Sequence, residues 1–343
     1  MLYKIIINVH INNYAGKARA STMNINTVPA KRDRLFRLLK DMYKFRYLYF
    51  IFSVVVVYYL LFAYAPMFNP ETGGILMAFK HFRYNSSFSE MDWVGLKWFD
   101  MMWSKPDFWL AIRNTFIISI GRLVIEFPMP IALAIILNEV RRGKPKRIFQ
   151  TIFTFPNFLS WVIVVSVLRD ILQLNGLINT GLRAFGAEPF NFLANKSMVA
   201  NLLLVFITNI WKDAGWSAII YLAAISGIDP QLYEASIVDG ANRWQCIVNI
   251  TWPGIKPTAV VLLILSCGSI LNAGFDQIFN LRNGINKETL EILDTYIYRY
   301  GFTESINQSF SVATGLFKSV INFTLLVLAN KFAHLLGSEG LFS

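Results

Sequence analysis

Six long apolar windows constrain the fold of this sequence more than any other feature. A helix that spans a bilayer needs about 20 mostly apolar residues, and each window approaches or exceeds that length. The windows are Tyr47–Tyr64, Asn114–Leu137, Ile148–Ile171, Asn201–Ile225, Thr258–Phe279 and Val312–Leu335. Pro128 and Pro130 fall inside the second window and predict a kink there. We therefore expect an all-α polytopic membrane protein with six transmembrane helices.

The composition favours membrane insertion over a large soluble core. Of the 343 residues, 55% are hydrophobic and 15% are charged, whereas a soluble domain carries roughly 25% charged residues. The sequence holds two cysteines and three histidines, which argues against both a disulfide framework and a metal site. The net charge of +11 comes from basic residues that gather beside the apolar windows, so nucleic acid is not an expected partner.

The basic residues also predict how the chain crosses the membrane, because cytoplasmic flanks are enriched in Lys and Arg. Two basic clusters lie on the same side if the chain has six spans. They are Lys31, Arg32, Arg34, Arg37, Lys40, Lys44 and Arg46 before the first window, and Arg141, Arg142, Lys144, Lys146 and Arg147 after the second. We expect the N-terminal tail at 1–42, the C-terminus and a polar insert at 226–257 to be cytoplasmic. In a simpler interpretation, the clusters only set the topology and contact anionic membrane lipid.

The polar insert at 226–257 begins with the pattern of a short, well-capped helix. Asp229 is a suitable N-cap, and Pro230 suits the first helical position. The pattern predicts a helix to about Asp239. Gly240 then permits the left-handed or tight turn that would end this helix.

A second short helix is expected to follow the turn. Ala241 or Asn242 would open it, and the dipeptide Trp252-Pro253 would stop it. The insert is therefore predicted to be a helix–turn–helix that lies across the cytoplasmic face.

The charge of the insert favours a protein groove over a lipid surface as its contact. Arg243 and Lys256 are its basic residues, whereas a helix that lies on lipid is usually rich in Lys and Arg. Tyr233 and Ile237 form a small apolar face, and Glu234 beside it offers negative charge to a partner. An amphipathic connector that lies on lipid is the alternative.

The insert also contains a specific motif. Its pattern is Glu234-Ala235-Ser236-x-x-Asp239-Gly240-Ala241, with Ile250 and Pro253 at matching distances downstream. This pattern resembles the EAA loop of binding-protein-dependent ABC importer permeases, although Ser236 replaces the usual second Ala and Trp252 stands where Leu is common. The resemblance implies a coupling helix that docks in a cleft of a cytoplasmic ATPase. The residues implied in this coupling are Tyr233, Glu234, Ala235, Ser236, Asp239, Gly240 and Ala241.

The resemblance extends from about Tyr43 to the end of the chain. Stretches such as Pro106-Asp107-Phe108-Trp109 and Trp211-Lys212-Asp213-x-Gly215-Trp216 are similar to the maltose-permease-like branch, which imports oligosaccharides and polysaccharides such as alginate or pectin fragments. This implies a membrane domain at 43–343 in a bacterial cytoplasmic (inner) membrane, and translocation of an oligo- or polysaccharide by alternating access. An acidic sugar is the finer expectation.

The resemblance also implies partners. They are a second homologous permease subunit in a heterodimer, two cytoplasmic ATP-binding subunits, an extracytoplasmic solute-binding protein, membrane lipid and the saccharide. No phosphate-loop motif of the form G-x-x-x-x-G-K-S/T occurs in this sequence. We therefore expect ATP and Mg on the partner chains, no cofactor on this chain, and a transport subunit that is not itself an enzyme.

Charged residues inside the windows are candidates for the substrate path, because a charge in a bilayer is costly. Arg122 and Glu126 are four residues apart on one helix, which predicts an ion pair, with a gating role as the alternative. Lys212 and Asp213 are adjacent and point about 100° apart. We expect that they do not simply neutralise each other, and that at least one faces a cavity or a neighbouring subunit. The substrate-path candidates are Arg122, Trp211, Lys212, Asp213, Trp216, Asn272, Asp276 and Lys318.

The remaining candidates have two interpretations each. Trp211 and Trp216 could stack on sugar rings, or they could only pack between helices. Asn272 and Asp276 lie near the outer end of the fifth window, where they could line the same path or cap the helix. Lys318 in the sixth window could face the cavity or extend toward the interface. If the basic candidates together line the path, an anionic sugar would be favoured.

Two other classes of function compete with an importer permease. An ion-coupled secondary transporter should show inverted repeats and intramembrane carboxylates, and we find no convincing repeat. An intramembrane enzyme such as a glycosyltransferase would need a catalytic constellation, and we find no persuasive one.

Overall fold

The computed structural model describes residues 44–69, 74–83, 86–140, 143–303 and 306–335. The tail at 1–42 lies outside the described residues, so its cytoplasmic location and the domain boundary after it stay predictions. The chain forms two units, residues 1–69 and residues 70–343.

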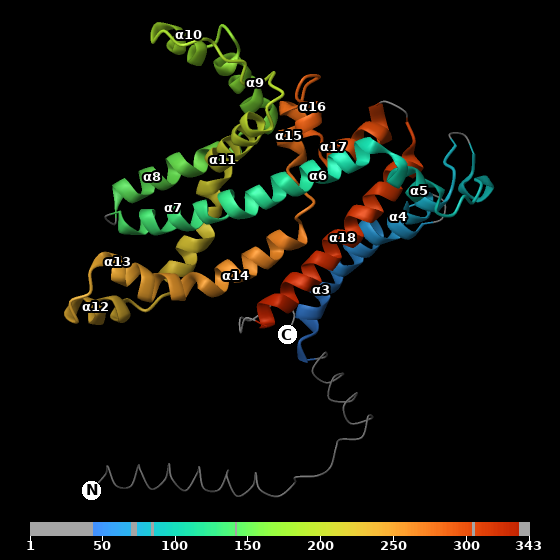
Figure 1. Cartoon of the computed structure of the whole chain (residues 1–343). Coiled ribbons are helices and arrows are strands. Elements are labelled where there is room, and N and C mark those ends of the chain that lie inside the picture. The colour runs from blue at the N-terminus through green and yellow to red at the C-terminus, as the bar shows by residue number, and fades with distance from the viewer. Residues whose placement is uncertain (1–43, 70–73, 84–85, 141–142, 304–305, 336–343) are drawn as a thin grey trace, which may run out of the picture. The chain divides into compact units, whose positions relative to one another are not determined.

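The described part of the first unit is a single helical run. It consists of α3 (Arg46–Tyr59), a π-helical turn (Leu60–Tyr64) and α4 (Ala65–Phe68) (Figure 1). No residue of α3 is buried. Because most of its side chains are apolar, this helix needs lipid or another protein around it.

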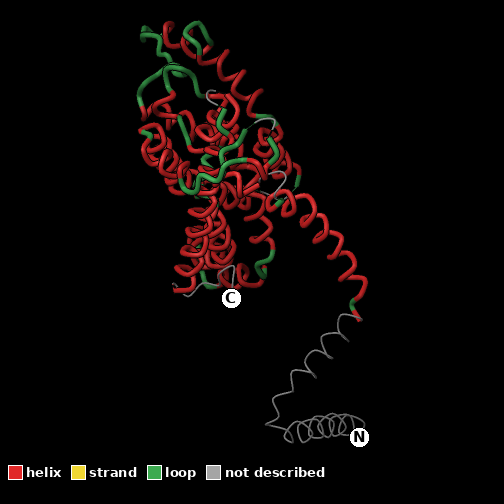
Figure 2. Tube along the Cα trace, turned by 90° about the vertical axis from the view of Figure 1, so that its right-hand side faces the viewer, coloured by secondary structure: helices red, strands yellow, loops and turns green. Residues whose placement is uncertain are grey.

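The second unit is helical throughout its described part. Figure 2 shows helices and loops in this unit and no strand, and the described residues contain a single isolated β-bridge between Lys80 and Trp93. Its α-helices are α5 (Lys97–Ser104), α6 (Pro106–Gly121), α7 (Pro128–Glu139), α8 (Lys144–Thr154), α9 (Trp161–Leu172), α10 (Leu177–Ala184), α11 (Met198–Ser226), α12 (Pro230–Val238), α13 (Arg243–Cys246), α14 (Trp252–Gly268), α15 (Phe275–Leu281), α16 (Lys287–Leu290), α17 (Leu293–Tyr298) and α18 (Gln308–Leu335).

The predicted fold class is confirmed. Six helical stretches of the described chain are long and apolar enough to cross a membrane. They are Arg46–Phe68, Pro106–Glu139, Trp161–Ala184, Met198–Ser226, Arg243–Gly268 and Gln308–Leu335. The first, second, fourth and sixth agree with the predicted windows apart from their ends. The third and fifth differ from the prediction.

The kink predicted in the second span takes the form of a π-helical turn. This turn, η4 (Arg122–Glu126), lies between α6 and α7. The N–H of Phe127 donates to the carbonyl of Arg122 at 2.9 Å, five residues back. Because Pro128 has no N–H to donate, the wider turn lets the helix continue past it.

The third span was predicted as one helix over 148–171, and this is wrong. The helix α8 ends at Thr154, a short 3₁₀ turn follows at Phe155–Phe158, and α9 begins at Trp161. Pro156 cannot donate to the helical ladder. Ser160 then starts a new helix, because its hydroxyl accepts the N–H of Ile163 at 3.3 Å.

The fifth span was predicted at 258–279, and it lies earlier. It runs from α13 through a π-helical turn (Ile247–Thr251) into α14, which ends at Gly268. The chain then leaves the helix until α15, and Gly274 adopts a left-handed φ of 84° just before it. The N–H of Leu271 in this break donates to the side chain of Asn322 on α18 at 3.1 Å. A partner on another span therefore supports the non-helical backbone.

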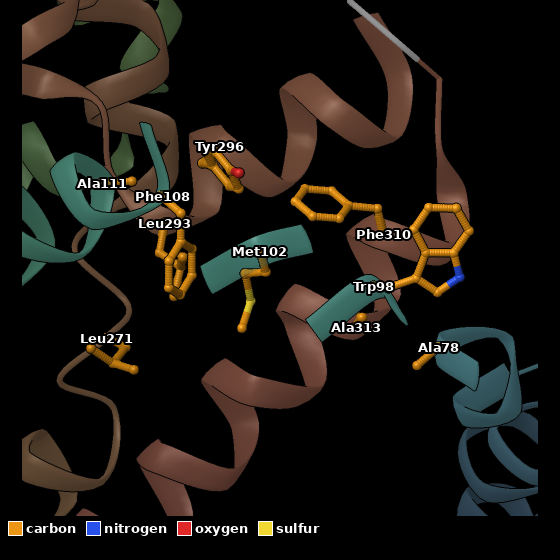
Figure 3. Close-up of a cluster of buried hydrophobic side chains, with 10 residues drawn as sticks. All are labelled: Ala78, Trp98, Met102, Phe108, Ala111, Leu271, Leu293, Tyr296, Phe310 and Ala313. Atoms are coloured by element: carbon orange, nitrogen blue, oxygen red, sulfur yellow. The ribbon is translucent and has the colours of Figure 1, made fainter. Parts of the chain in front are cut away.

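Buried apolar side chains of the second unit gather in three clusters. One joins α5, α6, α17 and α18 through side chains that include Trp98, Phe108, Tyr296 and Phe310 (Figure 3). Burial raises the pKa of the Tyr296 phenol above its ordinary value. The other two clusters include residues of α11, which also contacts α7, α8 and α14. α11 is thus the central helix of this unit.

Candidate functional site

The first candidate site is the insert between α11 and α14, and its local structure matches much of the prediction. The carboxylate of Asp229 caps α12 by accepting the N–H of Gln231 at 2.9 Å. Gly240 follows α12 with a φ of 81°. Asn242 and Gln245 then cap α13 reciprocally, each side chain accepting the other residue's N–H at 2.9 and 2.7 Å.

The prediction that Trp252-Pro253 ends the second short helix is wrong. The N–H of Trp252 bonds to the carbonyl of Ile247, five residues back, and the helix continues into α14. Pro253 has no N–H to donate, and the π-helical turn before it lets the helix continue past it. The insert therefore contains one separate helix, α12. The rest of its helical part, α13 and the π-helical turn, forms the beginning of the fifth span.

The outer surface of α12 combines acidic and apolar side chains. Glu234 and Asp239 are exposed, and Ile237 and Val238 are 66% and 87% exposed. Tyr233, predicted to join the apolar face, instead turns inward, and its hydroxyl lies 2.9 Å from the hydroxyl of Thr251. Sequence reasoning missed Val238 because it occupies an unspecified position of the motif, directly before Asp239.

The motif serine fixes α12 against α13. The hydroxyl of Ser236 donates to the carbonyl of Tyr233 at 2.8 Å and lies 3.2 Å from the sulfur of Cys246. Both partners lie this close because the side chain at position 236 is small. The Ser that replaces the usual Ala of the motif is still small enough for this packing. Arg243 adds an ion pair to Glu139 at the end of α7, at 3.7 Å.

The second candidate site is a cavity of about 420 Å³ between spans two, four and five. We call it the first cavity. Its polar lining comes from η4 and α6, from α11, from α14 and from the break after α14. The polar lining residues are Ser119, Arg122, Glu126, Asn209, Asp213, Ser217, Ser266, Ser269 and Asn272. Its volume lies in the range of small-ligand pockets.

Arg122 and Glu126 form the predicted i, i+4 ion pair, with 3.9 Å between Nε and the carboxylate. Each is also tied to another element. Arg122 donates to the amide oxygen of Gln277 on α15, and Glu126 accepts from the side-chain amide of Asn209 on α11. Gln277 in turn donates to the carbonyl of Val205 on α11 at 2.7 Å. One polar network therefore joins the second span, the fourth span and α15.

Lys212 and Asp213 depart from the prediction. They form an ion pair at 3.9 Å, although they are adjacent on α11. Asn157 makes this geometry possible, because its carbonyl accepts from Lys212 at 2.8 Å and its side chain donates to Asp213 at 2.9 Å. Lys212 is buried under the ring of Trp161, 5.5 Å from the ring centre. Asp213 lines the first cavity, as expected for at least one of the two.

Asn272 also lines the first cavity, whereas the remaining substrate-path candidates lie outside its lining. Trp211 is about 200° around α11 from Asp213, so it points away from the cavity and is 53% exposed. Trp216 packs edge-on against Phe158. Asp276 lies in the first turn of α15.

Lys318 on α18 forms an ion pair with Asp294 on α17. Asp294 lines a second cavity, also about 420 Å³, together with Gly274, Phe275 and Tyr298. Asn272 lines both cavities.

The basic candidates do not form a freely charged lining. Arg122, Lys212 and Lys318 each lie within 4 Å of a carboxylate. The reasoning that these three cations together favour an anionic sugar therefore loses its physical basis.

Sequence reasoning missed three partners that organise the first cavity. Asn209 carries the only weak signal, as a polar residue inside an apolar window. Asn157 and Gly274 carried no signal, since their roles depend on contacts with distant residues. Among the described residues, no group of three or more His, Cys, Asp or Glu side chains could hold a metal ion.

Comparison with known proteins identifies the class. Residues 127–336 match the family described as "Binding-protein-dependent transport system inner membrane component". The chain is 41% identical over 326 residues to the polygalacturonan/rhamnogalacturonan transport system permease protein YteP of Bacillus subtilis (strain 168), covering 95% of this chain and 99% of that protein. It is 37% identical to protein LplB of the same organism, over 93% of this chain and all of LplB.

Solved structures agree with these relatives. A crystal structure of a bacterial ABC transporter involved in the import of the acidic polysaccharide alginate aligns with a TM-score of 0.76 and 35% identity, over 87% of this chain and 98% of that chain. A structure of bacterial alginate ABC transporter in complex with alginate pentasaccharide-bound periplasmic protein aligns with a TM-score of 0.77 and 35% identity, over 89% and 100%.

The six spans, the polar cavity between the second, fourth and fifth of them and the exposed α12 define a multi-pass membrane subunit of permease type. The chain belongs to the family of inner membrane components of binding-protein-dependent transport systems. The predicted family, fold class and non-enzymatic, permease role are thus confirmed. The family assignment displaces the secondary transporter and the intramembrane enzyme.

Proposed function

We propose that this chain is one of two permease subunits in an ATP-driven importer of oligo- or polysaccharides. The observation that carries the proposal is the exposed α12, which presents Glu234, Ile237 and Val238 together at the surface. An apolar and acidic helix of this kind suits a groove in a partner protein. The names of the relatives support a saccharide as the cargo.

In this proposal α12 is the mechanical link to ATP hydrolysis. Two cytoplasmic ATPase subunits, which bind ATP and Mg, each hold the coupling helix of one permease. When the ATPases close, the coupling helices move together and the spans open outward to receive sugar from an extracytoplasmic binding protein. Both termini and α12 are then cytoplasmic, and the loop 281–310 faces outward.

The first cavity is the proposed share of the sugar path in this chain. Its serines, amides and carboxylates offer donors and acceptors that suit sugar hydroxyls. Relatives that import polygalacturonan and alginate support an acidic cargo. Because the cations of this chain are paired with carboxylates, the selection of a uronate would rest on the binding protein or the second permease.

Reconstitution tests the proposal. The chain would be assembled in proteoliposomes with its second permease, the ATPases and the binding protein. Uptake of labelled neutral and acidic oligosaccharides, and stimulation of ATP hydrolysis by the loaded binding protein, would then be measured. We expect ATP-dependent uptake of at least one saccharide class. Saccharide uptake that persists without the ATPase subunits would refute the proposed mechanism.

A further inference from the structure

The two cavities are separated by a thin partition. Asn272 lines both of them, Arg122 lines the first, and Gly274 lines the second. Arg122 belongs to the second span and Gly274 to the break that follows the fifth span, and the two lie in direct contact. The route from one cavity to the other is therefore closed where Arg122 meets the break after α14.

The guanidinium of Arg122 rests on the backbone of Gly274. A Cβ placed at Gly274 would lie 2.6, 2.9 and 3.0 Å from Nη2, Nη1 and Cζ of Arg122. The same guanidinium donates to Gln277, one turn further along. Only glycine allows this approach, and only glycine readily adopts the left-handed φ of 84° found there.

Arg122 has further bonding capacity in this position. Within the part of the chain that the structure describes, its five N–H groups make one hydrogen bond, to Gln277. Its Nε is buried without a hydrogen-bond partner, as is Oε1 of Glu126, 3.9 Å away. A buried charged group that lacks its full set of bonds gains by moving to a place where they can be made. The contact of Arg122 with Gly274 and Gln277 therefore closes the partition. The unpaired Nε–H group of Arg122 favours its release.

The side chain of Arg122 provides the moving part. The break at residues 269–274 is held in place, because Leu271 and Ala273 are fully buried and the N–H of Leu271 donates to Asn322. Gln277, just beyond the break, is anchored to α11 through Val205 and Thr208. A rotation of Arg122 away from Gly274 would leave the break, α11 and α15 in place.

We propose that Arg122, Gly274 and Gln277 form a latch that closes the sugar path between the second cavity, on the outer side, and the first cavity, within the spans. This inference rests on the proposed function and orientation. In the closed state seen here the guanidinium covers Gly274. In the open state Arg122 leaves Gly274, and the two cavities join past Asn272.

The test is the access of an external thiol reagent to the first cavity. Both native cysteines would be replaced, and Ser217, which lines the first cavity, would be changed to Cys as the reporter. The assembled complex in proteoliposomes would be treated from the outer side with a membrane-impermeant maleimide. The labelling rate would be compared between the reporter parent and latch variants.

Gly274→Ala should open the latch, because its Cβ displaces the guanidinium. Loss of a charge-assisted hydrogen bond and its packing should raise the labelling rate about tenfold. Gly186→Ala is the matched control, since Gly186 also has a left-handed φ, of 75°, but no atom within 4 Å of the added Cβ. Its labelling rate should equal that of the parent.

Arg122→Lys provides a second route to the same result. Lys keeps the charge beside Glu126 but lacks the flat fork that covers Gly274, so labelling should again rise. Unchanged labelling in either latch variant that still assembles, or an equal rise with Gly186→Ala, would overturn the latch. Uptake and ATPase stimulation by the parent are read separately. Their failure would refute the proposed function whatever the labelling shows.

Discussion

Gly215 provides the sharpest stability prediction, because it marks the closest approach between two helices. A Cβ on Gly215 of α11 would lie 2.0 Å from the carbonyl oxygen of Phe153 and 2.3 Å from its carbon. Real Cβ atoms are essentially never closer than 3.0 Å to such atoms, so α8 and α11 would have to separate by about 1 Å. Backbone cannot rotate aside as a side chain can.

The Gly215→Ala variant should therefore destabilise the protein. Overpacking of this kind costs about 1–3 kcal/mol, which outweighs the roughly 0.5–1 kcal/mol that Ala gains over Gly inside a helix. The matched control is Gly181→Ala in α10, where nothing lies within 4 Å of the added Cβ. This control should be neutral or slightly stabilising.

Thermal unfolding of the purified complex, followed by intrinsic fluorescence, would measure the difference. The midpoint of Gly215→Ala should fall below that of the parent, while the midpoint of Gly181→Ala should not. Since unfolding in detergent is seldom reversible, midpoints would be compared at one scan rate. Equal midpoints for the two variants would show that α8 and α11 do not approach as described.

Three further changes test other parts of the structure. Asp213→Asn should destabilise the complex by about 1 kcal/mol, because Lys212 loses a counter-ion that is 3.9 Å away and 41% exposed; adding Lys212→Met should restore the thermal midpoint, and no restoration would contradict the pairing. Gly240→Val should reduce the stimulation of ATP hydrolysis several-fold without loss of assembly, because a β-branched residue disfavours the left-handed φ. Gly240→Asn should retain most of the stimulation. Equal stimulation in the two variants would argue against the turn as part of the coupling element. Glu291→Gln should lower the thermal midpoint, because Glu291 is 4% exposed and pairs with Arg282 and Arg299. An unchanged midpoint would show that these two ion pairs are dispensable.

The insert shows how far sequence reasoning reaches. Its caps and its turn were predictable, since Asp229, Pro230 and Gly240 act on backbone within a few residues. The end of the second helix was not, because the effect of Pro253 depended on whether the preceding turn could widen into a π-helix. The rule that proline ends a helix does not say whether the chain will end the helix there or continue it through a widened turn.

The cavity marks the limit of that reasoning. The charged residues Arg122, Lys212 and Lys318 were recognised as costly in a membrane, but their partners were not all predictable. Glu126 lies one helical turn from Arg122, so its pairing followed from spacing. Asn157 bonds Lys212 from 55 positions away, and Asp294 meets Lys318 from another helix. Spacing along one helix does not report such contacts.

The sequence by itself determined that this is an all-helical, six-span permease with a short helix, α12, after the fourth span, because apolar length, helix caps and the motif around Gly240 are local properties. The tertiary structure decided where the spans break, which charges are neutralised and which side chains face the cavity. Those outcomes depend on groups brought together from distant spans, as when Asn322 holds the break at Leu271 and Arg122 covers Gly274. Buried polar groups must find partners wherever the fold supplies them, and only the assembled helices reveal which partners those are.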